Sequence, residues 1–163
     1  MTRLAPAAVL LVLLAPPAAA AEPFAPPDGR FRVEFPGRPK ETTTETRSAL
    51  GRLSVYTATY ALDGGRVLMV SYTDFPEGTA KPGQEAGVLD GVRKGLKGEE
   101  GDVLKDDEKS PRRELLVKKG DRHIRVVAVL DGDRLFQVKA VGPPAFVGGK
   151  DAAAFLKSFA VTK

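Results

Sequence analysis

The stretch HIRVVAVLDGDRLFQV, residues 123–138, contains two apolar runs joined at Asp131-Gly132-Asp133. An Asp-Gly pair between such runs is typical of a tight hairpin turn, so the stretch predicts two antiparallel strands. With a two-residue turn, either Asp131-Gly132 or Gly132-Asp133, one face carries Val127, Val129, Phe136, Val138 and Ala140. The opposite face carries Ile124, Val126, Ala128, Leu130 and Leu135. A three-residue turn would exchange the faces of the second strand, yet both would stay largely apolar, which predicts the middle of a sheet covered on both sides.

The only histidine of the chain, His123, begins this stretch. A catalytic histidine needs a partner that orients it and, for acyl transfer, a nucleophile within hydrogen-bond reach. None of the serines lies in the G-x-S-x-G pattern of an exposed nucleophile. The strand register places His123 and Arg125 at the margin of the first apolar row, so we expect a sheet-edge histidine and no catalytic residue.

Further strands are expected at residues 30–35, 42–48, 53–61, 66–75 and 113–119. The first alternates strictly, with Phe31, Val33 and Phe35 on one face. The second and third are rich in threonine and flank Ala-Leu-Gly, which predicts an antiparallel hairpin. The fourth is apolar on both faces, as expected of a central strand covered on both sides.

Two segments have the period of an amphipathic helix. Residues 84–97 place Val88, Leu89, Val92 and Leu96 on one stripe. Glycines at positions 87, 91 and 95 weaken this helix and form a smooth strip against which a neighbour could pack. Residues 150–160 repeat the pattern with Ala152, Phe155, Leu156 and Phe159. The charged segment 98–113 predicts a loop with at most a short strand at Val103-Leu104.

The order is therefore a run of strands, a helix, three more strands and a closing helix. It predicts an α+β fold in which helices cover both faces of an antiparallel β-sheet. The chain has 163 residues, enough for one domain, which we place at residues 29–163. A formal net charge of +4 from 25 basic and 21 acidic side chains neither demands nor excludes an anionic partner.

The first 21 residues have the layout of a secretory signal peptide: a basic Arg3, an apolar run over residues 4–14 and a small-residue site at Ala19-Ala20-Ala21. We expect cleavage before Glu22, a Pro-rich lead-in over residues 22–28, and export to the periplasm or the extracellular space. An uncleaved anchor is the alternative, although a membrane span needs about 20 apolar residues. The mature chain has no transmembrane segment by this criterion. The absence of cysteine excludes a lipoprotein, disulfides and thiol catalysis.

No cofactor or metal is expected. The acidic cluster Glu99, Glu100, Asp102, Asp106, Asp107 and Glu108 lacks the alternating spacing of a calcium loop and is read as a solvated segment. Gly148-Gly149-Lys150 resembles the end of a phosphate loop. However, Asp151 stands where Ser or Thr is needed, and Pro144 stands where the first glycine is needed.

One basic stretch is a candidate anion or partner patch, and its members are Lys109, Arg112, Arg113, Lys118, Lys119, Arg122 and Arg125. If these cations converge, they attract an anionic polymer or lipid surface. On alternating strands they would instead spread over two faces and a turn.

The segments GRFRVEFPGRPK (29–40), GDRLFQVKAVGPP (132–144) and AAAFLKSFAV (152–161) resemble the first strand, last strand and closing helix of exported bacterial PsbP-like domain proteins. The resemblance rests on Phe31, Val33, Phe35, Pro36, Gly37, Pro39, Arg134, Leu135, Phe136, Gln137, Phe155, Leu156, Ser158 and Phe159. It implies a PsbP/Mog-type α/β/α sandwich and a non-enzymatic role in docking or assembly. These motifs are structural, so no functional residue is carried over.

The leading hypothesis is an exported, non-catalytic binding or accessory protein of the bacterial cell envelope, with another protein as its partner. One alternative is an anion-binding module that uses residues 109–125. The other is an unrecognised enzyme that uses the acidic segment or His123. A nucleic-acid partner is not expected, because a net charge of +4 shows no concentrated basic face.

Overall fold

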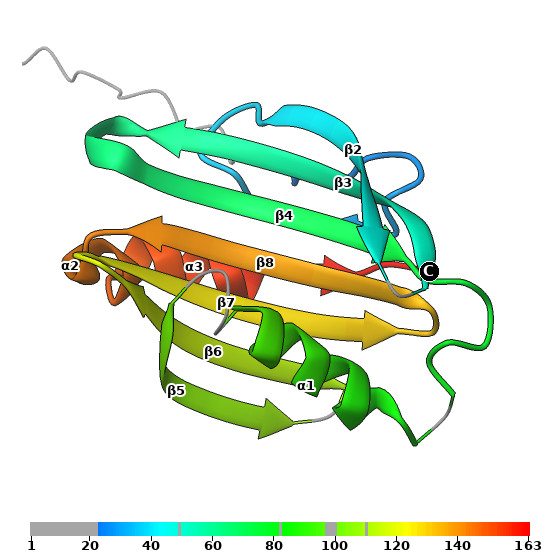
Figure 1. Cartoon of the computed structure of the whole chain (residues 1–163). Helices are drawn as coiled ribbons and strands as arrows, with labels where there is room; N and C mark the ends of the chain where they lie inside the picture. Colours follow the sequence, from blue (N-terminus) through cyan, green and yellow to red (C-terminus); the bar gives the residue numbers. More distant parts are fainter. Residues whose placement is uncertain (1–22, 49, 82, 97–100, 110) are drawn as a thin grey trace, which may run out of the picture.

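The computed structural model describes residues 23–163, apart from 49, 82, 97–100 and 110. Seven strands form one antiparallel sheet in the order β2-β3-β4-β8-β7-β6-β5 (Figure 1). Their bounds are Lys40–Ser48 (β2), Gly51–Leu62 (β3), Arg66–Asp74 (β4), Asp102–Lys109 (β5), Arg112–Lys119 (β6), Arg122–Asp131 (β7) and Arg134–Gly142 (β8). A second, two-stranded sheet pairs β1 (Phe31–Arg32) with β9 (Ala160–Val161).

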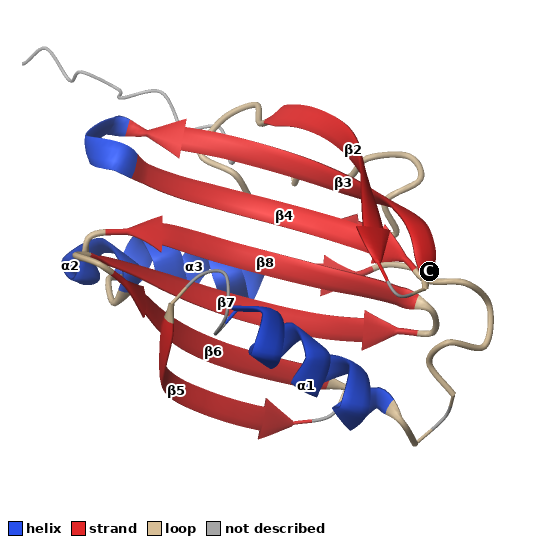
Figure 2. Cartoon of the chain, in the orientation of Figure 1, coloured by secondary structure: helices blue, strands red, loops and turns tan. Residues whose placement is uncertain are grey.

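Helices form a small part of the described chain (Figure 2). They are α1 (Glu85–Gly95), α2 (Pro144–Val147), α3 (Lys150–Ser158) and the 3-10 turn η1 (Asp63–Gly65). On one face of the sheet, which we call the α1 face, Leu89 of α1 packs against β7 and β8, and Leu96, which directly follows α1, packs against β6 and β7. On the opposite α3 face, Phe155 and Leu156 pack among side chains of β7 and β8.

The expected α/β/α sandwich is wrong: the described chain is mainly a seven-stranded antiparallel sheet with few helices. A sheet of seven strands is about 29 Å wide, whereas a helix is about 10 Å across and covers about two strands. Figure 1 accordingly shows α1 in front of β6 and β7 only, and no described helix in front of β2, β3 and β4. The expectation that β4 is covered on both sides fails for the same reason, since Val67 and Met69 on the α1 face are only partly buried.

The hairpin of residues 123–138 is confirmed, and of the turns that the sequence left open the structure has the two-residue turn Gly132-Asp133. Asp131 pairs with Arg134 across the two-residue turn Gly132-Asp133, and Val129 pairs with Phe136. The two apolar rows then fall on opposite faces of the sheet. Val127, Phe136, Val138 and Ala140 enter the core of the α3 face, while Ile124, Val126, Ala128, Leu130 and Leu135 pack on the α1 face.

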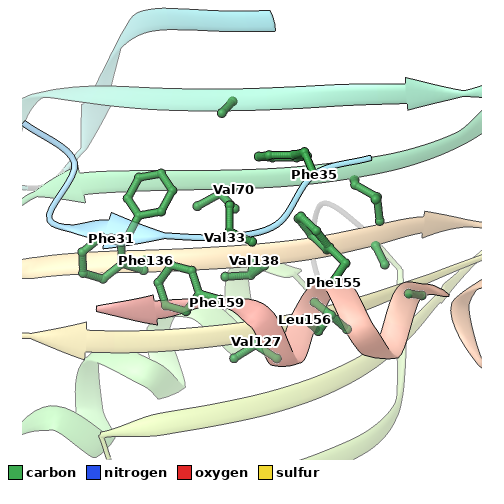
Figure 3. Close-up of a cluster of buried hydrophobic side chains, with 14 residues drawn as sticks. Phe31, Val33, Phe35, Val70, Val127, Phe136, Val138, Phe155, Leu156 and Phe159 are labelled. Atoms are coloured by element: carbon green, nitrogen blue, oxygen red, sulfur yellow. The ribbon is translucent and has the colours of Figure 1, made fainter. Parts of the chain in front are cut away.

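An extended N-terminal segment, rather than a helix, supplies much of the cover on the α3 face. Phe31, Val33 and Phe35 are at most 4% exposed, as their alternation predicts. Figure 3 shows them among the side chains of β4, β7, β8 and α3. Only residues 31–32 of the expected strand 30–35 form β1, and Val33 instead makes an isolated bridge with Phe24.

The remaining predictions have mixed outcomes. The Thr-rich hairpin is confirmed as β2 and β3, and both long helices are present as α1 and α3. The expected loop at residues 98–113 is wrong, because Asp102–Lys109 forms β5 along the edge of the sheet. The three glycines of α1 are exposed, and an added Cβ at any of them would meet no atom within 4 Å. The predicted signal peptide lies outside the described residues.

Candidate functional site

The seven cations of the predicted basic patch are divided between the two faces of the sheet. Side chains alternate along a strand, and directly paired residues share a face. Arg113, Lys119 and Arg122 therefore lie on the α1 face. Lys109, Arg112, Lys118 and Arg125 lie on the α3 face.

Arg113 on the α1 face is a buried structural residue. Its side chain is 5% exposed, and its Nε and Nη2 donate to the two carboxylate oxygens of Asp106 at 2.7 and 2.9 Å. Its Nη1 donates to Asp90 of α1 at 2.8 Å, and Glu108 of β5 lies 3.3 Å away. These carboxylates raise the pKa of Arg113, chiefly through the hydrogen bond to Asp106. Arg113 thus joins α1 to β5 and β6 and is not open to an external anion.

Part of the acidic cluster is explained by the same contacts. Asp106 and Glu108 face Arg113, and the hydrogen bond from Arg113 lowers the pKa of Asp106. Glu99 and Glu100 lie outside the described residues. Within the described part of the chain, no group of three His, Asp or Glu side chains converges in an arrangement that could hold a metal ion.

Arg122 also has a structural contact, because it donates through Nη2 to the carbonyl oxygen of Gly65 in η1. That bond joins the beginning of β7 to the turn between β3 and β4. Lys109 and Lys118 are exposed on the α3 face near opposite ends of β6.

Arg125 lies in a different setting, on the lining of a cavity of about 420 Å³. The cavity lies on the α3 face where β5, β6 and β7 continue beyond the cover provided by α3, and α2 forms one wall. Its lining residues are Lys105, Glu114, Leu116, His123, Arg125, Pro144, Val147 and Gly148. We refer to it as the β7 cavity.

Strand pairing brings the lining residues together. Leu116 of β6 lies directly between Lys105 of β5 and Arg125 of β7, because it is paired with both. His123 is two positions before Arg125 on the same face of β7. Pro144, Val147 and Gly148 come from α2 and the residue after it, and Val147 is fully buried. Cationic groups therefore lie beside an apolar floor and wall.

An ion pair holds the guanidinium of Arg125 in place. Its Nε donates to Oε1 of Glu114 at 2.6 Å, and its Nη2 lies 2.6 Å from the same oxygen. The Arg125 and Glu114 side chains are 31% and 25% exposed, so both remain in contact with solvent. An arginine carries five N–H donors, more than one carboxylate oxygen can accept. Arg125 is thus oriented by Glu114 and retains capacity to bind a second anion.

The lining of the β7 cavity combines an excess of positive charge with apolar surface. Lys105 and Arg125 exceed Glu114 by one positive charge, so the cavity favours an anionic group. Leu116, Pro144 and Val147 provide apolar surface for the rest of a ligand. Within the described part of the chain, His123 makes no side-chain hydrogen bond of the kind that orients a general base.

Sequence reasoning placed His123 and Arg125 at a margin of the apolar sheet but did not identify a cavity there. Lys105 was missed because its segment was expected to be a loop. The wall from α2 was missed because the segment GPPAFVGG, residues 142–149, is expected from the sequence to be a loop. Recognising β5 as a strand that pairs with β6 would have placed Lys105 beside Leu116.

Comparisons with known proteins identify no family for this chain. No model of a known protein family matches it, and no curated protein matches it. Among solved structures it is similar to a protein of Bacteroides thetaiotaomicron VPI-5482, with 14% identity and a TM-score of 0.47. The match covers 88% of this chain and 49% of that one, so this chain spans about half of its length. This similarity supports no argument about function, and the resemblance to PsbP-like domains stays a prediction.

Proposed function

We propose that this chain is an exported, non-catalytic binding protein of the bacterial cell envelope whose β7 cavity binds a small anionic ligand. The observation that carries this proposal is the oriented Arg125 on the lining of a cavity that also contains Lys105 and apolar side chains. This proposal retains anion binding, one of the alternatives from the sequence. It places the anion in a cavity beside Arg125 and not on a patch of seven cations. Export rests on residues 1–21, outside the described part of the chain.

The ligand chemistry follows from the lining. A cavity of about 420 Å³ lies within the range of about 300–1,000 Å³ that is usual for small-molecule sites. Arginine binds a carboxylate with planar, paired hydrogen bonds, whereas lysine acts as a flexible point charge. Leu116, Pro144 and Val147 suit a short hydrocarbon or aryl group. The ligand class is therefore a small amphipathic carboxylate, which enters with its charged end toward Arg125 and Lys105.

Calorimetric titration with hexanoate and phenylacetate, each compared with its neutral amide, tests this proposal. We expect saturable binding of the acids and at least tenfold weaker binding of the amides. Because R125Q alone leaves Glu114 without its cation, the informative variant is the double change R125Q/E114Q. It and K105Q should each weaken acid binding at least tenfold, while K109Q, which changes an exposed lysine outside the cavity, should not.

Two results would overturn the cavity assignment. One is the absence of saturable binding for both acids, and the other is unchanged affinity in R125Q/E114Q. Export is tested separately by expressing the full chain in a bacterial host and fractionating the cells. A periplasmic or secreted product that begins at Glu22 supports it, and full-length protein in the cytosol contradicts it.

A further inference from the structure

Strand β2 is the edge of the sheet farthest from the β7 cavity, and among the strands that the structure describes it is bonded to β3 alone (Figure 1). All nine of its residues are exposed. Its sequence, KETTTETRS, contains four threonines, which favour strands, and neither proline nor glycine. Its pairing with β3 runs without a bulge, whereas the other edge, β5, is irregular between Val103 and Lys105. Bulges protect sheet edges from further pairing, so β2 is the less protected edge.

The register of the hairpin shows which backbone groups of β2 point outward. Ser48 pairs with Gly51 across a two-residue turn, so these two residues exchange the first pair of backbone hydrogen bonds. Hydrogen-bonded positions alternate along an antiparallel pair, so every second residue before Ser48 also bonds to β3. The intervening residues, Glu41, Thr43, Glu45 and Arg47, direct their N–H and C=O groups to the open side.

We propose that β2 pairs with β2 of a second copy of this chain, antiparallel and centred on Thr44. In this register Glu41 lies opposite Arg47 of the second copy, and Thr43 lies opposite Glu45, so outward-pointing residues meet. All nine residues of β2 are paired. The twofold axis passes between the two Thr44 residues at right angles to the sheet, and the two sheets become continuous.

The charges on β2 favour this register over the two registers that are shifted by two residues. Only shifts by an even number of residues keep outward groups opposite one another. A shift by two in one direction places Glu41 opposite Glu45, and a shift by two in the other places Glu45 opposite itself. Like charges directly opposite destabilise a strand pair, whereas opposite charges stabilise it. The register that pairs the whole strand is thus also charge-matched.

The β2–β3 hairpin itself also favours the addition of a further strand beside β2. Strand β4 pairs with β3 only from Val55 to Leu62, so residues 51–54 of β3 and their partners on β2 form a two-stranded ribbon. Two-stranded ribbons are marginally stable in water. Within this ribbon Arg47 lies opposite Arg52, a like-charged pair. The second copy would add a third strand and place the carboxylate of Glu41 beside Arg47. Tyr56 donates a 2.6 Å hydrogen bond to that carboxylate and holds it at the edge.

Sedimentation equilibrium of the full chain and two complementary variants tests the interface. E41K alone and R47E alone each create two like-charge contacts, so each should raise the dimer dissociation constant at least tenfold. Their equimolar mixture restores both opposite-charge contacts and should dimerise within about threefold of the unchanged chain. K109E changes a residue of β5, at the opposite edge of the sheet; it is the control and should dimerise like the unchanged chain.

A proline variant provides an independent test. T43P removes an N–H that points away from β3, so it should abolish the dimer and leave the hairpin intact by circular dichroism. A chain that stays monomeric at about 200 µM would overturn the proposal, because a dissociation constant well above that concentration leaves no appreciable dimer. A dimer that T43P leaves unchanged, or variants whose mixture does not restore association, would likewise overturn it.

Discussion

The guanidinium carbon of Arg134 lies 4.1 Å from the centre of the Tyr72 ring, a cation–π contact between β8 and β4. The same guanidinium donates to both carboxylate oxygens of Asp74. Its Nη1 donates to the carbonyl oxygens of Asp28 and Gly29 at 2.6 and 2.9 Å. Arg134 therefore attaches the N-terminal segment to the end of the sheet, next to the point where that segment enters the core.

We expect R134A to lower the free energy of unfolding by about 2–3 kcal/mol, because it leaves two carbonyl groups and one carboxylate without their charged donor. D74N removes only the carboxylate partner, which is 56% exposed, so it should cost under about 1 kcal/mol. Urea unfolding followed by circular dichroism measures both values. Equal costs for the two variants would show that the bonds to Asp28 and Gly29 and the contact with Tyr72 together contribute nothing.

Truncating a residue of the aromatic core should lower the free energy of unfolding by more than R134A does. Phe31 is 1% exposed, and the centre of its ring lies 6.0 Å from that of Phe136 and 5.8 Å from that of Phe159. F31A should therefore cost about 3–5 kcal/mol, the usual range for an emptied aromatic site. L50A truncates a side chain that is 48% exposed and should change stability by less than about 0.5 kcal/mol. If both variants unfold at the same urea concentration, the N-terminal segment does not form part of the cooperative core.

The contact between Arg113 and Asp106 should make stability depend on pH. Arg113 lowers the pKa of Asp106 in the folded state below its ordinary value of about 3.9. Such a carboxyl group stabilises the fold above its unfolded pKa, and this contribution is lost as the pH falls through the folded pKa. The stability difference between the unchanged chain and D106N should accordingly be largest above pH 5 and shrink below about pH 4. Urea titrations at pH 3, 4, 5 and 7 measure it, and a difference independent of pH would contradict the assignment.

The parts of the fold that could be predicted share one property: the pattern of their apolar side chains matches the pattern of burial. The hairpin at residues 123–138 and its two apolar faces were predicted because both faces are apolar and Asp-Gly-Asp marks the turn, although the sequence left the exact turn open. Phe31, Val33 and Phe35 were placed on one buried face for the same reason. Apolar periodicity in a sequence indicates which side chains of an element are buried, so it can be read only in elements that bury one or both faces.

The parts that could not be predicted depend on neighbours distant in the sequence. Strand β5 has one partly buried residue, Val103, among exposed ones, so its pairing with β6 leaves no periodic signal. Strand β4 was expected to be covered on both faces because it is apolar on both, but apolar residues on a strand do not show how far a helix extends over the sheet. The β7 cavity draws its lining from β5, β6, β7 and α2. Sequence spacing alone does not place those elements around one volume.

Gly101, at the entrance to β5, gives the sharpest test of that unpredicted strand. It has φ +126°, outside the range that other residues adopt, and a Cβ built there would lie 2.1 Å from the carbonyl oxygen of Lys118. Gly120, in the turn between β6 and β7, has φ +62°, and its Cβ would meet nothing within 4 Å. G120A should therefore cost only about 1 kcal/mol for its left-handed backbone, whereas G101A should cost at least about 3 kcal/mol, because β5 must move away from β6. Hydrogen exchange should show faster exchange in β5 and β6 of G101A, with β3 and β4 unchanged. Equal stability of the two variants would mean that the backbone of Gly101 does not approach Lys118 as closely as this structure places it.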